Sequence, residues 1–123
     1  MKTALVLAVL LPLACLPAKA YEIRSGAVTI CDTQGQVERY VQLFDGNAQL
    51  AIGAVNTEEH DPSACALVNV SYVQGPELGI IRSREHAFQV MPIVVVGVDT
   101  PTGYRRAAPA LFFTPVKVAE FAV

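Results

Sequence analysis

The sequence has few of the side chains from which most catalytic and metal centres are built. It contains two histidines, His60 and His86, and three cysteines among 123 residues. It has no Gly-x-Ser-x-Gly nucleophile elbow, no Cys-x-x-Cys pair, and no cysteines or histidines at zinc-site spacing. We therefore expect no catalytic residues, no metal ligands and no cofactor.

An excess of positive charge is also missing. The chain carries 9 lysines and arginines against 11 aspartates and glutamates, which gives a net charge of −2 at pH 7. Nucleic acids and anionic membrane surfaces are bound through basic patches. The acidic balance therefore argues against both classes of partner.

One segment does gather acidic side chains and a histidine. Glu58-Glu59-His60-Asp61 is the densest group of possible metal ligands in the chain. Adjacent residues in a loop rarely converge on one ion without ligands from elsewhere, and no such set has metal-site spacing. We interpret this segment as a solvated acidic loop.

Residues 1–20 have the three parts of a secretory signal peptide. Lys2 supplies a positively charged start, an apolar run follows, and a small-x-small cleavage site ends at Ala20. The run is too short to span a membrane, so we expect export and no transmembrane segment in the mature chain. A lipid anchor through Cys15 is the less favoured route, because Pro12 stands where a lipoprotein box has leucine.

Two cysteines survive either route, namely Cys31 and Cys65. Exported proteins form disulfides, and a chain with two cysteines is best explained by one bond between them. A bond that closes a loop of about 35 residues stabilises a fold by about 3–4 kcal/mol in the chain-entropy model. The sequence thus predicts a single disulfide-stapled domain over residues 21–123.

Helical periodicity begins just after the first of these cysteines. Thr33 and Gln36 fit a capping box. Apolar side chains at i, i+3, i+4 and i+7 give residues 37–44 one buried face. The same spacing recurs over residues 48–55, behind a possible N-cap at Asn47. We expect two helices that fold back on one another.

Strand patterns occupy the rest of the chain. The predicted strands cover residues 27–30 before the helices and residues 66–73, 78–82, 93–96 and 111–118 after them. We expect the strand at 93–96 to be buried on both faces. Short turns, the first at residues 74–77, join antiparallel neighbours. The predicted fold is α+β: a short N-terminal strand, a helical hairpin and a four-stranded antiparallel β-meander, with the helices on one face of the sheet.

Four arginines stand in two pairs near the ends of predicted strands. Arg82 lies close to Arg84, and Arg105 precedes Arg106. Converging guanidinium groups would form an anion site or a partner contact, with Tyr104 stacked beside it. On the other interpretation they are exposed hairpin charges that protect strand edges. The acidic net charge favours the second interpretation.

Several segments together form a recognisable pattern. They are Cys31-Asp32-Thr33-x-x-Gln36-Val37-Glu38-Arg39, Leu43-Phe44-Asp45-Gly46, Ala54-Val55-Asn56, Asp61-Pro62-x-x-Cys65 and the strand at 94–98. In this pattern the chain resembles a family of small exported bacterial proteins of uncharacterised function, over most of the mature domain. The resemblance implies a place in the bacterial envelope and supports the pairing of Cys31 with Cys65. It implies no activity and no catalytic residues.

Two functional hypotheses follow from the sequence. The first is a non-enzymatic binding domain, in the bacterial periplasm or outside the cell. Its partner would be another envelope protein or a small ligand on the concave face of the sheet, and an inhibitor of an exported enzyme is one version, suggested by a cystatin-like order of elements. The alternative is a small hydrolase or ligand-processing enzyme with an NTF2-like pocket and His60 or His86 as base. A pocket that encloses a histidine and a carboxylate would favour the enzyme.

Overall fold

The computed structural model describes residues 22–83 and 86–118. The expected signal peptide over residues 1–20, with Cys15, lies outside these ranges, and so does Arg84. No helix within the described ranges is long and apolar enough to cross a membrane.

The first half of the domain is a strand followed by two helices. These are β1 (Ile23–Cys31), α1 (Gln34–Leu43) and α2 (Ala48–Glu59). The capping box that starts α1 is confirmed, because Thr33 Oγ1 accepts from the Gln36 amide at 3.1 Å and Gln36 Oε1 accepts from the Thr33 amide at 3.0 Å. The Asn47 side chain caps α2 by accepting from the Leu50 amide.

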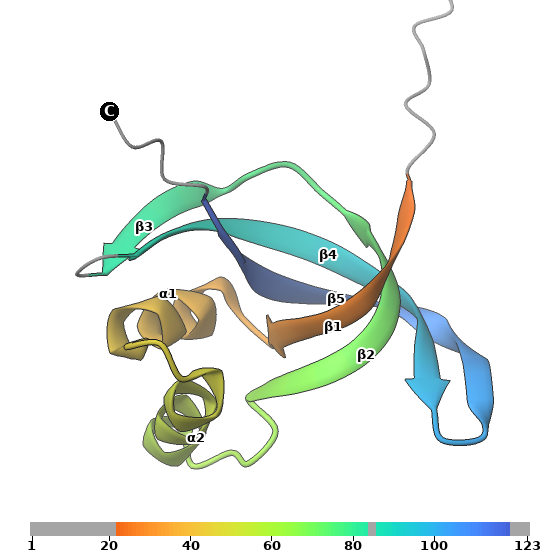
Figure 1. Ribbon diagram of the computed structural model, residues 1–123, viewed down its shortest axis with the longest axis horizontal. Helices are drawn as coiled ribbons and strands as arrows, with labels where there is room; N and C mark the ends of the chain where they lie inside the picture. Colours follow the sequence, from red (N-terminus) through yellow and green to blue (C-terminus); the bar gives the residue numbers. More distant parts are fainter. Residues whose placement is uncertain (1–21, 84–85, 119–123) are drawn as a thin grey trace, which may run out of the picture.

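The second half supplies four strands: β2 (Cys65–Gln74), β3 (Gly79–Ser83), β4 (His86–Thr100) and β5 (Gly103–Lys117). All five strands form one antiparallel sheet in the order β2-β1-β5-β4-β3, and β2 also pairs with β4. Strands β1, β2, β4 and β5 therefore close on one another in a ring. Figure 1 shows the sheet strongly curved, with both helices beside one end of it.

The predicted α+β architecture is confirmed, and the predicted four-stranded meander is matched in part, because β3, β4 and β5 pair in chain order whereas β2 does not pair with β3. The predicted turn at residues 74–77 does not reverse the chain. The amides of Gly75 and Leu78 donate to the carbonyls of Pro92 and Val90, both at 2.8 Å, and hold this segment along the edge of β4. As a result β2 and β3 follow one another along the same edge of β4 and do not form a hairpin.

The prediction that residues 93–96 are buried on both faces was also wrong. Ile93 is fully buried, whereas the side chain of Val94 is 36% exposed. Helix α1 has 10 residues and β4 has 15, which correspond to lengths of about 15 Å and about 50 Å. The helices therefore cover only the first part of β4, and the outward face beyond them stays in contact with solvent.

Two apolar clusters fill the domain, one on each face of the sheet. The helix-side cluster joins both helices to strand residues that include the two cysteines, Phe88 and Val90. The inner cluster lies within the curve of the sheet and consists of Ile30, Val70, Ile93 and Val95, with Val28, Val68, Tyr72 and Phe112 packed against it. Residues 30 and 31 belong to different clusters, as expected when side chains alternate along a strand.

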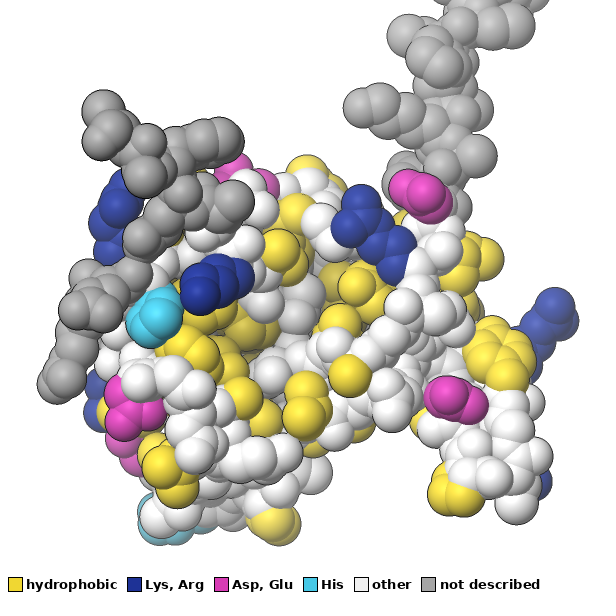
Figure 2. Space-filling view, viewed as in Figure 1, with side chains coloured by type: hydrophobic (Ala, Val, Ile, Leu, Met, Phe, Trp, Pro, Cys, Tyr) yellow, Lys and Arg dark blue, Asp and Glu magenta, His cyan; other side chains and the backbone are white. Residues whose placement is uncertain are grey.

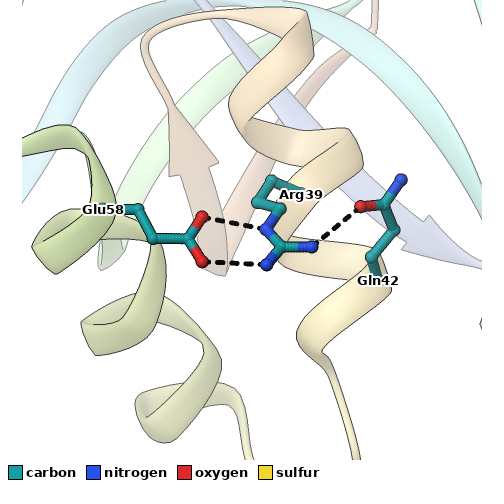
Figure 3. A network of polar contacts seen from close by, with 3 residues as sticks. All are labelled: Arg39, Gln42 and Glu58. Carbon is teal, nitrogen blue, oxygen red and sulfur yellow. Dashed lines mark hydrogen bonds and ion pairs between the residues drawn. The ribbon is translucent and has the colours of Figure 1, made fainter.

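The predicted disulfide is present. Cys31 and Cys65 are bonded, are cross-strand partners of β1 and β2, and are at most 1% exposed. A second link ties the two helices together at the surface, where the Arg39 guanidinium donates to both carboxylate oxygens of Glu58 at 2.8 and 2.9 Å and to Gln42 (Figure 3).

Loss of the disulfide is expected to destabilise the fold substantially. The double variant Cys31→Ala/Cys65→Ala should lower the free energy of unfolding by about 3–4 kcal/mol, because the unfolded chain regains the entropy of an open loop. Urea unfolding of the variant and of the oxidised and reduced wild type measures this. An unchanged urea midpoint in all three samples would contradict the role given to the bond.

The Arg39–Glu58 pair predicts a small dependence of stability on pH. The hydrogen bond from Arg39 holds the pKa of the Glu58 carboxyl below its ordinary value, so the stabilisation is present above that value and is lost as the pH falls through the lowered pKa. Glu58→Gln should therefore flatten urea stability between about pH 5 and pH 3. Glu59→Gln is the matched control, and an equal effect of both substitutions would contradict the assignment.

Candidate functional site

The two edges of β1 differ in how completely they are paired. All nine residues of β1 have partners on β2, from Ile23 opposite Val73 to Cys31 opposite Cys65. On the other edge β1 meets β5 at a single position, Cys31 opposite Phe113. Figure 1 shows the two strands diverging from this point in a V. Most of the outer edge of β1 is therefore without a strand partner among the described residues.

Three observations show which backbone groups face this outer edge. The carbonyl of Thr29 accepts a hydrogen bond from the Thr114 hydroxyl on β5 at 2.6 Å, so residue 29 points its backbone outward. The Cα atoms of Cys31 and Cys65 are only 4.1 Å apart, which is the narrow spacing of a cross-strand pair without backbone hydrogen bonds. The side chains of Ser25 and Ser71 approach to 2.9 Å, as in another narrow pair. Odd-numbered residues of β1 thus face outward and even-numbered residues bond to β2.

The divergence of β1 from β5 opens a cleft of about 330 Å³, which we call the β1–β5 cleft. It is lined by Arg24, Ala27, Val28, Thr29, Leu67, Tyr72, Gln74, Thr114, Pro115, Val116 and Lys117. Figure 2 shows a hollow in the middle of this face, with apolar side chains inside it and basic side chains on both sides. Val28 and Tyr72 also pack on the inner cluster, so the cleft reaches one wall of the core.

The two strands that flank the cleft are not equally able to accept another strand. Proline has no backbone N–H and is typical of protected edges, and β5 carries Pro115 within the cleft and Pro109 further back. Strand β1 has no proline, and Arg24 is its one charged residue. Proline, a common means of protecting a strand edge from pairing, is therefore present on β5 and absent from β1.

Further hollows are lined by residues that the structure describes, and two of them lie near the cleft strands. One, of about 450 Å³, is almost wholly apolar and is lined by Val73, Gln74, Gly75, Pro92, Val94 and Leu111 on the outward face beyond the helices. The other, of about 320 Å³, is more polar and is lined by Ser25, Gly26, Asn69, Val70, Ser71, Asp99 and Tyr104. The polar hollow contains Ser25 of β1 and the acidic Asp99, and neither hollow is lined by a basic side chain.

The four arginines singled out in the sequence do not share one site. Arg82 is opposite Ala87 at the start of β4, whereas Arg105 is opposite Val98 near its other end. About 35 Å of extended strand separates those two positions. Arg106 lies beside Arg105, with its side chain exposed. Arg105 and Arg106 are thus consecutive residues of β5, whose side chains point to opposite faces of the strand, and Arg82 lies opposite the other end of β4.

The histidines also lie apart from one another. His60 ends α2 in the left-handed conformation, with φ of 54° and an exposed side chain. The His86 ring packs edge-on against Phe44, with 5.1 Å between ring centres. Ser83, the nearest hydroxyl in sequence, donates to the Gln42 carbonyl at 3.5 Å. Within the described residues, no three potential metal-ligating side chains come together.

The residues of the sequence pattern have structural roles. The Asn56 side chain donates to the carbonyls of Pro62 and Cys65 and accepts from the Cys65 amide at 2.8 Å, which fixes the loop that leads to the disulfide. Asp61 accepts from the backbone and hydroxyl of Ser63 in the same loop, and these bonds lower the pKa of the Asp61 carboxyl.

Comparison of the chain with protein-family models, curated proteins and solved structures finds no match in any of the three.

Neither Arg24 nor Lys117 was predicted as a site residue from the sequence. Arg24 precedes the predicted first strand, which began at residue 27, whereas Lys117 lies within the predicted strand over residues 111–118. The sequence did contain a sign of a longer strand. Arg24, Val28 and Ile30 share the same parity along the chain, and Gly26 is the only residue between positions 23 and 27 that disfavours a strand. Extending the strand backward would have placed a basic residue on it. The opposite wall, formed by β5, has no local signature because its position depends on long-range pairing.

The outward and inward positions of β1 should differ in amide hydrogen exchange. The amides of Val28 and Ile30 bond to β2 and should exchange slowly, whereas those of Ser25 and Ala27 face the open edge and should exchange rapidly. Residue-resolved exchange by NMR measures the alternation. Slow exchange at Ser25 and Ala27, equal to that at Val28, would show that the outer edge is paired.

Proposed function

We propose that the protein is an exported binding domain that captures an extended segment of another protein along the outer edge of β1. The observation that carries the proposal is the β1–β5 cleft, where a strand edge that has one strand partner among the described residues borders a lining of mixed polar and apolar side chains. Addition of a strand to an open sheet edge is a recurrent mode of peptide recognition. In that mode backbone hydrogen bonds give affinity, and pockets for alternate side chains give specificity.

The geometry also favours one direction for the bound segment. Strands β1 and β5 are antiparallel, so a single strand between them runs antiparallel to one and parallel to the other. Antiparallel pairs are slightly more stable for each residue, and β5 lacks the N–H of Pro115. The segment is therefore expected to pair antiparallel to β1. It would bond to the outward backbone groups of residues 25 and 27.

The cleft supports binding better than catalysis. Its polar side chains are Arg24, Gln74, Lys117, two threonines and a tyrosine, and neither histidine lines it. The small-hydrolase alternative requires His60 or His86 beside a nucleophile, whereas His86 packs on Phe44 and Ser83 bonds to Gln42. A general base has to lie within hydrogen-bond reach of the group that it deprotonates.

The disulfide bears on the cellular compartment in which the protein acts. A buried disulfide between Cys31 and Cys65 is compatible with an oxidising compartment, such as the bacterial periplasm or the extracellular space. The signal peptide expected over residues 1–20 and the resemblance to exported bacterial proteins support the same location. The partner is then an envelope or secreted protein. In one version of the proposal the partner is an exported enzyme, and one of its strands binds along β1.

Site-specific photocrosslinking tests the binding surface in cells. A photoreactive phenylalanine analogue at Ala27, an exposed position on the outer edge of β1, should give a discrete crosslinked product in bacteria that export the protein. The same analogue at Gly53 is the control, because that exposed helix position has open space for a side chain. Equal products from both positions, or none from Ala27, would contradict the proposal.

A proline variant tests whether the partner forms backbone hydrogen bonds to β1 or only lies near it. Ala27→Pro removes an outward N–H while leaving the β2 ladder bonds of residues 26 and 28 in place, so it should reduce crosslinking from a second analogue at Ser25 by about tenfold. Ala108→Pro, in the exposed irregular part of β5, is the matched control. An intact disulfide and an unchanged melting temperature verify the fold of both variants.

A further inference from the structure

We propose that the captured segment carries an acidic side chain that lies between Arg24 and Lys117 at the wide end of the β1–β5 cleft. This inference rests on the proposed function and adds the chemical class of the partner. Both basic residues line the cleft, one on β1 and the other on β5. They therefore come from the two strands that form opposite walls of the cleft.

Among the residues that the structure describes, the two basic side chains of the cleft form no salt bridge. None of the eleven lining residues is acidic, and the nearest acid in sequence, Glu22, is not among them. In the described part of the chain the one salt bridge joins Arg39 and Glu58, neither of which lines this cleft. Two like charges on facing walls repel one another, and a carboxylate between them removes that repulsion and adds two attractive contacts.

The basic pair stands out because the chain as a whole is acidic. With a net charge of −2, the protein would not attract an acidic partner through its overall field. Recognition of a carboxylate therefore has to be local. A local contact of this kind fixes which segment binds and in which register, more than it adds to affinity.

The antiparallel pairing with β1 determines where in the bound segment the acidic residue lies. Strand β1 runs from Ile23 at the wide end of the cleft to Cys31 at its closed apex. A segment antiparallel to β1 begins near the apex and reaches Arg24 toward its C-terminal side. Its alternate residues face Val28, Tyr72 and Val116, the larger apolar groups in a lining that also contains polar side chains. The class of ligand is thus an extended segment of about six residues with alternating apolar side chains, followed by aspartate or glutamate.

Selection from a random peptide library displayed on phage tests this assignment, because it requires no identified partner. The wild-type protein should enrich peptides with alternating apolar residues and an acidic residue on their C-terminal side. The double charge reversal Arg24→Glu/Lys117→Glu should enrich lysine or arginine at that same place. Arg106→Glu, an exposed reversal outside the cleft, should retain the preference of the wild type.

The affinity of a selected peptide supplies the second readout. Replacement of its acidic residue by glutamine should weaken binding to the wild type about three- to tenfold, which is the range for two exposed ion pairs. The same replacement should leave binding to the charge-reversed protein unchanged or improved. Circular dichroism and an intact disulfide establish that each variant is folded.

The possible results separate the two levels of the proposal. Enriched peptides that compete with one another but show no acidic preference, or the same preference in wild type and charge-reversed protein, would overturn the acidic specificity and leave strand capture standing. Failure of the folded wild-type protein to enrich any peptide over the Ala27→Pro variant would overturn strand capture itself, and the acidic specificity with it.

Discussion

The position of Cys31 constrains the rest of the structure. It is bonded to Cys65, it forms the single bridge to Phe113 on β5, and the helical hairpin begins within three residues of it. After this point the chain turns into α1, so β5 has no further stretch of β1 to pair with on that side. Before this point β1 follows β2 and diverges from β5. The cleft opens because β1 stays in register with β2.

This arrangement gives a physical reason for the two apolar clusters and for the cleft between the strands. The helices seal the face that carries both cysteines, and the curve of the sheet encloses the inner cluster on the other face. The ring of strands closes at the bridge between Cys31 and Phe113 and stays open where Val28 and Tyr72 reach the surface. Strand edges without partners are usually protected, and the proposed binding function starts from the open edge of β1.

The sequence predicted features that depend on local chemistry. The capping box at Thr33, the two helices and the disulfide are as expected, because each depends on short-range patterns or on the number of available partners. Which strands pair with one another was harder to predict. Gly75 and Pro76 are typical turn residues, yet long-range bonds to Pro92 keep the chain extended there. Periodicity shows which side chains share a face and carries no information about which strand edge remains free.

The open edge depends on the divergence of β1 from β5, and nuclear Overhauser contacts between the two backbones measure that divergence most directly. Cross-strand backbone contacts are expected at Cys31 and Phe113, and none between Val28 and Val116 or between residues nearer the start of β1 and the end of β5. Continuous contacts along those pairs would show a closed sheet without a free edge at β1, and that result would contradict the proposed divergence.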